Sequence, residues 1–206
     1  GFMLMVDSES FMMLFIGLEI GSISLYALAG INRGDLLSNE AALKYFLLGS
    51  LASCVLVYGV ALVYISLSIS GFYDTAIAIP YIGAGNVPLT TFIGFLFIIV
   101  GLLFKVAAAP FQSWAPDVYQ GSPTSVTIFF AILPKIAALT VFIRFLYVPF
   151  ANMSDQWQMI IIFLSIASMI FGAVAAIGQT NLKRLVAYSS IGHMGYALAG
   201  LSVGTN

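Results

Sequence analysis

The sequence predicts an all-α integral membrane fold with about six transmembrane helices, one of them broken by proline. Of its 206 residues, 61% are hydrophobic and only 7% are charged, whereas soluble domains carry about 25% charged residues. Apolar stretches of about 20 residues recur along the chain, which is the length that crosses a bilayer as a helix. These stretches are continuous and do not alternate with a period of two, which favours helices over barrel strands.

The predicted spans form one membrane domain over residues 1–206. In chain order they lie at Phe11–Ala29, Ala41–Ile65, Thr90–Ala109, Val126–Tyr147, Met159–Ile177 and Leu185–Leu201. Ser38 or Asn39 is expected to cap the second span, and Asn181 the sixth. A loop from Ser66 to Pro88, rich in glycine and proline, is expected between the second and third spans.

Proline interrupts the end of the third span. Pro110 and Pro116 each remove a backbone donor, and each disfavours helix at the preceding residue. We therefore expect a helix, a break and a short helix, placed where protein or a hydrated cavity satisfies the freed backbone groups. Pro134 is expected to loosen the fourth span, so that water reaches Lys135.

Four ionisable residues lie near the middle of apolar stretches: Glu19, Lys105, Lys135 and His193. A charge at the bilayer centre costs roughly 2.5–3.5 kcal/mol on insertion scales, so it persists where it is paired or used. Glu19 is expected to pair with Lys105 and to tune its proton affinity as one coupled unit. Lys135 is far from either end of its span, which predicts a proton-relay group.

Each of these groups also has a purely structural interpretation. Glu19 and Lys105 could form an inert ion pair, or Lys105 could extend towards the nearer membrane surface. His193 suits a proton relay because imidazole titrates near neutral pH. An interhelical hydrogen bond beside Gly192 and Gly195 explains His193 equally well.

The remaining basic residues predict the orientation of the chain. Six crossings place Arg33, Lys44, Lys183 and Arg184 on one side, expected to be the cytoplasm or the mitochondrial matrix, and Arg144 on the other. Lys44 lies one turn into the membrane and is a candidate for proton entry. The residues expected at the membrane interface are Trp114, Asp117, Arg144, Lys183 and Arg184, with Trp157 in the aromatic belt.

Several functional classes are excluded by composition. One histidine and one cysteine supply no metal-ligand set, and the chain contains no nucleophile–base arrangement. A net charge of −1 without a basic patch argues against nucleic acid. The chain opens with Gly-Phe-Met and stops after an apolar stretch, so we expect it to be part of a longer protein or the product of a split gene.

Three long motifs carry a resemblance to a known family. The segment FKVAAAPFQSWAPDVYQGSPT (104–124) resembles the core signature of the antiporter-like membrane subunits of respiratory complex I, NADH:ubiquinone oxidoreductase. The segments EAALKY (40–45) and KRLVAYSSIGHMGY (183–196) resemble its subunit 2 branch, called NuoN in bacteria. PKIA (134–137) and WAPD (114–117) are most similar to mitochondrial versions.

The resemblance implies a fold of about fourteen helices with two inverted five-helix repeats, each forming a proton half-channel. Residues 1–150 would be most of the first repeat and residues 151–206 the start of the second. Glu19 and Lys105 would be the family's glutamate–lysine pair and Lys135 its central lysine. His193 would lie on the hydrated axis towards the second repeat. Gln112 departs from the histidine usual at its position, so its role stays open.

The resemblance also implies a proton-translocating subunit in the membrane arm of the complex. NADH, FMN, iron–sulfur clusters and ubiquinone would belong to other subunits, with no cofactor in this chain. The expected partners are other complex I membrane subunits, a chain that supplies the missing second repeat if the gene is split, and membrane lipids. The expected location is the mitochondrial inner membrane, with a bacterial plasma membrane as the alternative. A sodium/proton antiporter subunit and a structural scaffold are the competing functions.

Overall fold

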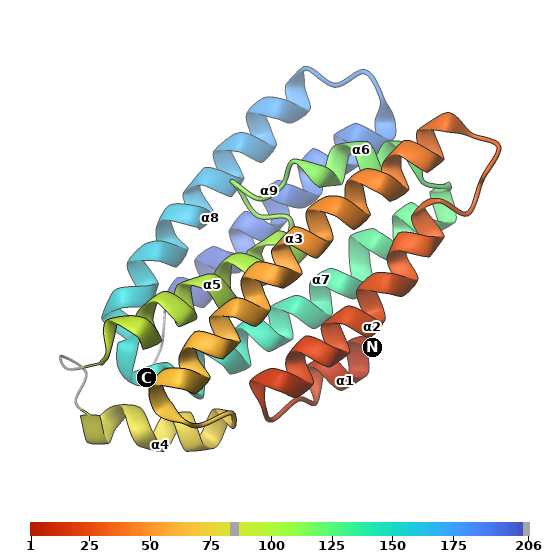
Figure 1. Cartoon of the computed structure of the whole chain (residues 1–206). Helices are drawn as coiled ribbons and strands as arrows, with labels where there is room; N and C mark the ends of the chain where they lie inside the picture. The colour runs from red at the N-terminus through yellow and green to blue at the C-terminus, as the bar shows by residue number, and fades with distance from the viewer. Residues whose placement is uncertain (83–86, 204–206) are drawn as a thin grey trace.

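The computed structural model describes residues 1–82 and 87–203, and this part of the chain is a bundle of helices (Figure 1). The helices are α1 (Phe2–Val6), α2 (Phe11–Ala29), α3 (Leu36–Leu67), α4 (Phe72–Ile82), α5 (Leu89–Val106), α6 (Trp114–Gly121), α7 (Thr124–Tyr147), the short 3₁₀ turn η2 (Ala151–Met153), α8 (Ser154–Ile177) and α9 (Leu182–Ser202). The connections α2–α3 and α8–α9 lie at one end of the bundle, and α4 lies at the other.

Five helices of the described chain are long and apolar enough to cross a membrane: α2, α3, α5, α7 and α8 with the turn before it. These match the first five predicted spans. The sixth predicted span is also a helix, α9, but it does not belong to this apolar group. Polar residues such as Ser189, Ser190 and His193 lower its mean hydropathy. Helix α3 has 32 residues, or about 48 Å at 1.5 Å per residue, so it extends past a hydrocarbon core of about 30 Å.

The loop predicted from Ser66 to Pro88 is wrong in part, because it contains α4. Phe72, Thr75 and Ile79 are buried on one face of this helix, at the spacing of successive helical turns. Pro80 lies in the last turn of this helix, where it removes one backbone hydrogen bond to the preceding turn. Residues 83–86 of the predicted loop lie outside the described residues.

Side chains at the helix starts satisfy backbone donors that the helix leaves open. Asn181 accepts from the backbone N–H of Lys183 at 2.9 Å, which confirms the predicted cap of α9. The cap of α3 is Asp35, which accepts from Leu37 N–H at 3.1 Å, and the prediction of a cap at Ser38 or Asn39 is wrong. Ser38 instead donates to the Ala29 carbonyl at 2.8 Å and joins α3 to α2.

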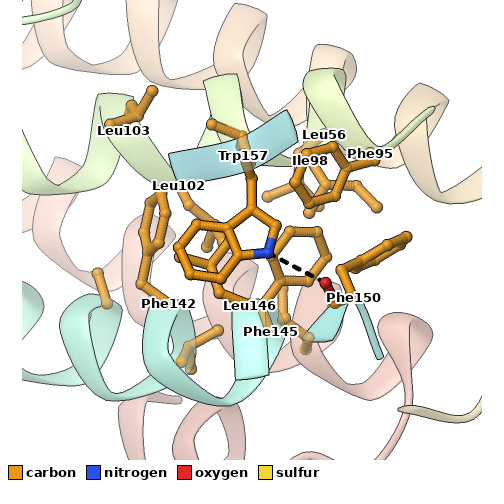
Figure 2. Packing of buried hydrophobic residues seen from close by; sticks show 14 of the residues in the cluster. Leu56, Phe95, Ile98, Leu102, Leu103, Phe142, Phe145, Leu146, Phe150 and Trp157 are labelled. Carbon is orange, nitrogen blue, oxygen red and sulfur yellow. Dashed lines mark hydrogen bonds between the residues drawn. The ribbon is translucent and has the colours of Figure 1, made fainter. Parts of the chain in front are cut away.

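The largest apolar core lies where α5, α7 and α8 meet (Figure 2). Trp157 of α8 is 1% exposed, and its indole N–H donates to the Phe150 carbonyl at 3.0 Å. Phe95 and Phe145 stack with ring centroids 5.6 Å apart. The predicted place of Trp157 in an interfacial aromatic belt is therefore wrong, since its ring fills the core and its polar atom is satisfied internally.

The predicted break after α5 is confirmed, but of the three prolines only Pro110 lies in it. Helix α5 ends at Val106, Ala107 has left-handed backbone (φ 57°), and Pro110 lies in the gap before α6. Pro116 breaks nothing, since it sits in the first turn of α6, where a missing N–H costs no helical bond. Pro134 breaks nothing either, because α7 continues through it.

Protein groups satisfy the backbone and side chains at this break. The Ala109 N–H donates to the Ser168 hydroxyl of α8 at 2.9 Å, and the Ala108 N–H donates to the Leu103 carbonyl at 3.1 Å. The Trp114 indole N–H donates to the Phe104 carbonyl at 3.0 Å. The bundle itself thus covers this irregular backbone. Such cover is needed because lipid offers no hydrogen-bond partners to exposed backbone groups.

Candidate functional site

Lys105 lies in the last turn of α5, and its side chain is held by hydroxyl groups. The residue is 7% exposed. Its ammonium donates to the Ser22 hydroxyl at 2.8 Å and to the Tyr26 hydroxyl at 3.4 Å. Both partners project from α2, four residues apart, so one face of α2 supplies the environment of this lysine.

Glu19 shares that face of α2, one turn before Ser22. It is half-buried, and the Ser53 hydroxyl of α3 donates to its carboxylate. Among the described residues, no nitrogen–oxygen contact within 4.0 Å joins Glu19 to Lys105. The predicted direct pair is therefore corrected: Ser22, not the carboxylate, contacts the lysine, and Glu19 lies one turn away along α2.

Lys135 lies deep in α7 and is 4% exposed. Its ammonium donates to the Ser190 hydroxyl of α9 and lies 5.8 Å from the centroid of the Tyr119 ring of α6. The Tyr119 hydroxyl is buried and has no hydrogen-bond partner among the described residues. Helix α9 thus brings a hydroxyl, and helix α6 an aromatic ring, to this buried ammonium of α7.

A small cavity lies beside Lys105. Lys105, Ser22, Tyr45 and Pro134, the residue before Lys135, line it together with apolar side chains. Its volume is about 10 Å³, close to the space that one water centre needs. The cavity therefore reaches from the first lysine to the residue that precedes the second.

His193 is not brought to either lysine. It is exposed on α9, three residues after Ser190, and its ring lies 6.4 Å from that of Tyr196. Ser190, which was not among the predicted site residues, lies beside Lys135 instead. Serine is common in membrane helices, so only the packing of α9 against α7 distinguishes Ser190 from its neighbours.

An ionic cluster joins α3, α6 and α9 at the basic end of the bundle. Asp117 of α6 accepts from Lys44 at 2.6 Å and from Arg184 at 2.6 Å, and Lys44 also pairs with Glu40 at 2.7 Å. Together with Gln120 these residues line a cleft of about 180 Å³. Partial burial opposes ionisation of Asp117, but hydrogen bonds from Lys44 and Arg184 outweigh it and lower the pKa of this carboxyl.

The ionic cluster changes the predicted roles of its members. Lys44, the candidate for proton entry, is held between two carboxylates. Asp117 and Arg184, both predicted at the membrane interface, pair with each other across 67 residues of sequence. Opposite charges on three segments assigned to the same membrane face were the signal that could have predicted this cluster.

The other basic residues agree with the predicted sidedness. Lys183 donates to the Ser122 carbonyl at 2.7 Å, beside the ionic cluster. Arg33 lies in the α2–α3 connection at that same end (Figure 1). Arg144, near the end of α7, donates to the carbonyl of Val6, the last residue of α1, at the opposite end.

Two residues of the motif around the break are buried. Trp114, predicted at the membrane interface, is 2% exposed and stacks on Tyr45 with ring centroids 4.6 Å apart, so that prediction is wrong. Gln112 is also buried, and its side-chain oxygen has no hydrogen-bond partner among the described residues. An unpaired buried amide oxygen is costly and marks a place where a further donor fits.

Comparison with known proteins gives one family. A family described as "NADH:quinone oxidoreductase/Mrp antiporter, TM" matches residues 8–206. NADH-quinone oxidoreductase subunit N of Pelagibacter ubique is 61% identical over 206 residues, covering all of this chain and 43% of the relative. The Rhodospirillum rubrum subunit N is 52% identical, with 100% and 42% covered. The chain thus spans less than half the length of these curated relatives.

Solved structures share the arrangement of helices. Respiratory complex I from Thermus thermophilus contains a chain 38% identical, with a TM-score of 0.80, covering 97% of this chain and 42% of the other. An archaeal membrane-bound sulfane sulfur reductase gives 31% identity and a TM-score of 0.85, with 98% and 41% covered. The Mrp complex from a Dietzia species, 22% identical with a TM-score of 0.86 and 96% and 36% covered, shares the fold.

Proposed function

The chain belongs to the NADH:quinone oxidoreductase/Mrp antiporter transmembrane family, and on that premise we propose that it forms part of a proton-translocating membrane subunit of NADH-quinone oxidoreductase. The Pelagibacter and Rhodospirillum relatives carry the name subunit N of that enzyme. Lys105 and Lys135 would be the proton carriers, and Glu19 would tune the first of them. Residues 1–150 would form most of one repeat and residues 151–206 the start of a second.

One observation carries this proposal: both buried lysines are held by hydroxyl groups. Lys105 donates to Ser22 and Tyr26, and Lys135 donates to Ser190. A hydroxyl accepts from an ammonium and donates to a neutral amine, so it suits both protonation states of a lysine. A carboxylate in contact would favour only the charged state. An arrangement that tolerates both states is what a proton relay needs.

The direct test removes each lysine in the assembled enzyme. We expect Lys105→Ala and Lys135→Ala to leave the complex assembled and to slow turnover coupled to pumping by about 100-fold, the lower end of the effect of removing a positioned proton-transfer group. Lys183→Ala is the matched control, because that lysine contacts a carbonyl at the bundle end. Normal pumping by both variants in assembled enzyme would refute the relay.

Two other functions fit the family or the fold. A sodium/proton antiporter subunit is suggested by the Mrp part of the family description. Turnover that falls when potassium replaces sodium would favour it, whereas a proton relay needs no sodium. A structural scaffold predicts that the lysine variants change the amount of assembled complex and nothing else.

The setting of the subunit is part of the proposal. The named relatives are bacterial, which favours the plasma membrane over the mitochondrial inner membrane that some motifs suggest. Its partners would be the other membrane subunits of the complex, a segment or chain that supplies the remaining repeat, and lipids. With one histidine and one cysteine, the chain would leave NADH, FMN, the iron–sulfur clusters and ubiquinone to other subunits.

A further inference from the structure

A cleft opens between the end of α2 and the start of α3, at the basic end of the bundle. Its volume is about 650 Å³, many times the roughly 30 Å³ share of one water molecule. Arg33 and Asn39 lie at its mouth, and the Asn39 amide donates to the Arg33 carbonyl at 3.1 Å. Ala27 and Ala42 belong to its walls. The cleft is therefore wide, partly polar and placed at the face that carries most of the basic residues.

Tyr26 joins this cleft to Lys105. It lines the cleft, yet the residue is only 7% exposed. Its hydroxyl lies 3.4 Å from the Lys105 ammonium. Space for that hydroxyl comes from Gly49 of α3, where a Cβ atom would overlap the Tyr26 oxygen. Tyr26 thus both lines the cleft and contacts the first buried lysine, through a hydroxyl that can donate and accept.

The polar connections continue inward from Lys105. Its ammonium contacts Ser22, which lines the small cavity that ends at Pro134. Lys135 follows Pro134 in α7 and contacts Ser190 of α9. The cleft, Tyr26, Lys105, Ser22 and the small cavity form one series, which ends at Pro134, the residue before Lys135.

We propose that protons reach Lys105 through the α2–α3 cleft and that the Tyr26 hydroxyl passes them to the lysine. This inference rests on the proposed function, since it names the route by which the relay is filled. The Tyr26 oxygen accepts a proton from a hydronium ion in the cleft, which becomes water, as its own proton moves to the neutral Lys105 amine, so the hydroxyl is restored after each transfer. Lys44, bound between Glu40 and Asp117, is not on this route.

The first experiment changes the hydroxyl in the assembled enzyme. We expect Tyr26→Phe to slow coupled turnover roughly tenfold, less than the 10²–10⁴-fold of a typical proton-transfer group because cleft water partly replaces the hydroxyl. Gly49→Ala keeps the hydroxyl but displaces it, and we expect a loss of the same order. Tyr58→Phe is the matched control, because Tyr58 is exposed on α3 and its ring contacts Phe97 instead.

A second experiment blocks the cleft without touching any hydroxyl. In a Cys54→Ser background, because Cys54 is exposed, Ala27→Cys is treated with a charged, membrane-impermeant methanethiosulfonate reagent from the basic side. We expect modification to slow proton uptake, and a reducing agent to restore it. Ala173→Cys, exposed one turn before the end of α8, is the control whose modification leaves uptake unchanged. A merely structural role of Tyr26 predicts no effect of blocking.

The outcomes separate this route from the relay itself. If Lys105→Ala stops pumping while Tyr26→Phe, Gly49→Ala and modified Ala27→Cys all pump normally, the relay stands and the route is overturned. If Lys105→Ala also pumps normally, the proposed function is overturned together with the route. Slowed pumping in the Tyr26 and cleft variants, with both controls normal, supports the route.

Discussion

At the scale of single residues, hydroxyl groups decide the environment of the buried charges. The sequence drew attention to Glu19, Lys105 and Lys135, because isolated charges in apolar stretches are conspicuous. It did not predict Ser22, Ser190 or Tyr26 beside them, since these residue types are common in membrane helices and only packing selects them. The rotation of α2 that places Ser22 against Lys105 depends on tertiary contacts that no local pattern contains.

Loss of the Ser190 hydroxyl tests the contact at Lys135. Ser190→Ala leaves a buried ammonium without its donor–acceptor partner, and hydrogen bonds to charged groups are worth about 1.5–3 kcal/mol. We expect the thermal unfolding midpoint of the purified subunit in detergent to fall accordingly, and coupled turnover to slow. Ser189→Ala, at the exposed neighbouring position, should change neither quantity. Equal behaviour of the two variants would contradict the contact.

The carboxyl of Asp117 gives a pH-dependent prediction. Its pKa is lowered in the folded chain despite partial burial, because Lys44 and Arg184 donate hydrogen bonds to it. Its contribution to stability is therefore complete above the pKa of an unfolded aspartate, about 3.9, and is lost as the pH falls through the lower folded value. We expect Asp117→Asn to be less stable than the parent near pH 7, with the difference shrinking in acid, as followed by thermal unfolding at several pH values.

At the scale of elements, the short helix α6 is fixed from both sides. Asp117 ties it to Lys44 of α3 and to Arg184 of α9. The same helix carries Tyr119, whose ring lies beside Lys135. The break after α5 and the short helix were predictable from Pro110 and the residues around it. The ion pairs of Asp117 with Lys44 and Arg184 were not predicted, although the sequence placed all three residues towards one membrane face.

Close packing of α6 on α3 gives a prediction for Gly121. A Cβ atom there would overlap the Leu37 carbonyl and approach the Ala41 side chain to 2.7 Å. Overpacking of this kind costs about 1–3 kcal/mol, so Gly121→Ala should lower the unfolding midpoint. Gly192→Ala is the matched control, because a Cβ atom at that helical glycine meets nothing within 4 Å. A midpoint for Gly121→Ala as high as that of the control would contradict the packing.

The span predictions succeed where an apolar stretch is long and continuous. The predicted Phe11–Ala29 coincides with α2 because Ser10 caps its start and Gly30 ends it. Helix α4 was missed because glycine and proline around it are typical of loops, although its buried face follows helical spacing. Trp114 and Trp157 were misplaced because membrane-belt tryptophans and core tryptophans look alike in sequence.

At the scale of the whole molecule, the bundle is polarised. Lys44, Lys183, Arg184 and the mouth of the α2–α3 cleft lie at one end, while Arg144 and α4 lie at the other. The buried lysines lie between these ends. The chain covers 43% of its Pelagibacter relative. The exposed face of α9 with His193 remains the predicted direction of proton transfer.

The identity of the transported ion is a further prediction for the whole molecule. We expect coupled turnover of the assembled enzyme to be unchanged when potassium replaces sodium, because the interior contacts described are hydrogen bonds between ammonium and hydroxyl groups. The measurement is the rate of NADH oxidation together with the pH change outside sealed vesicles. Sodium dependence of both rates would support the antiporter alternative instead.

The most direct test of the relay is the number of protons moved per NADH oxidised by assembled enzyme carrying Lys135→Met. Methionine keeps an unbranched side chain in the Lys135 site but carries no proton. We predict normal amounts of complex and a clear fall in protons moved per NADH, with sealed vesicles and the parent enzyme measured side by side. An unchanged ratio at an unchanged rate would contradict proton transfer through this buried lysine.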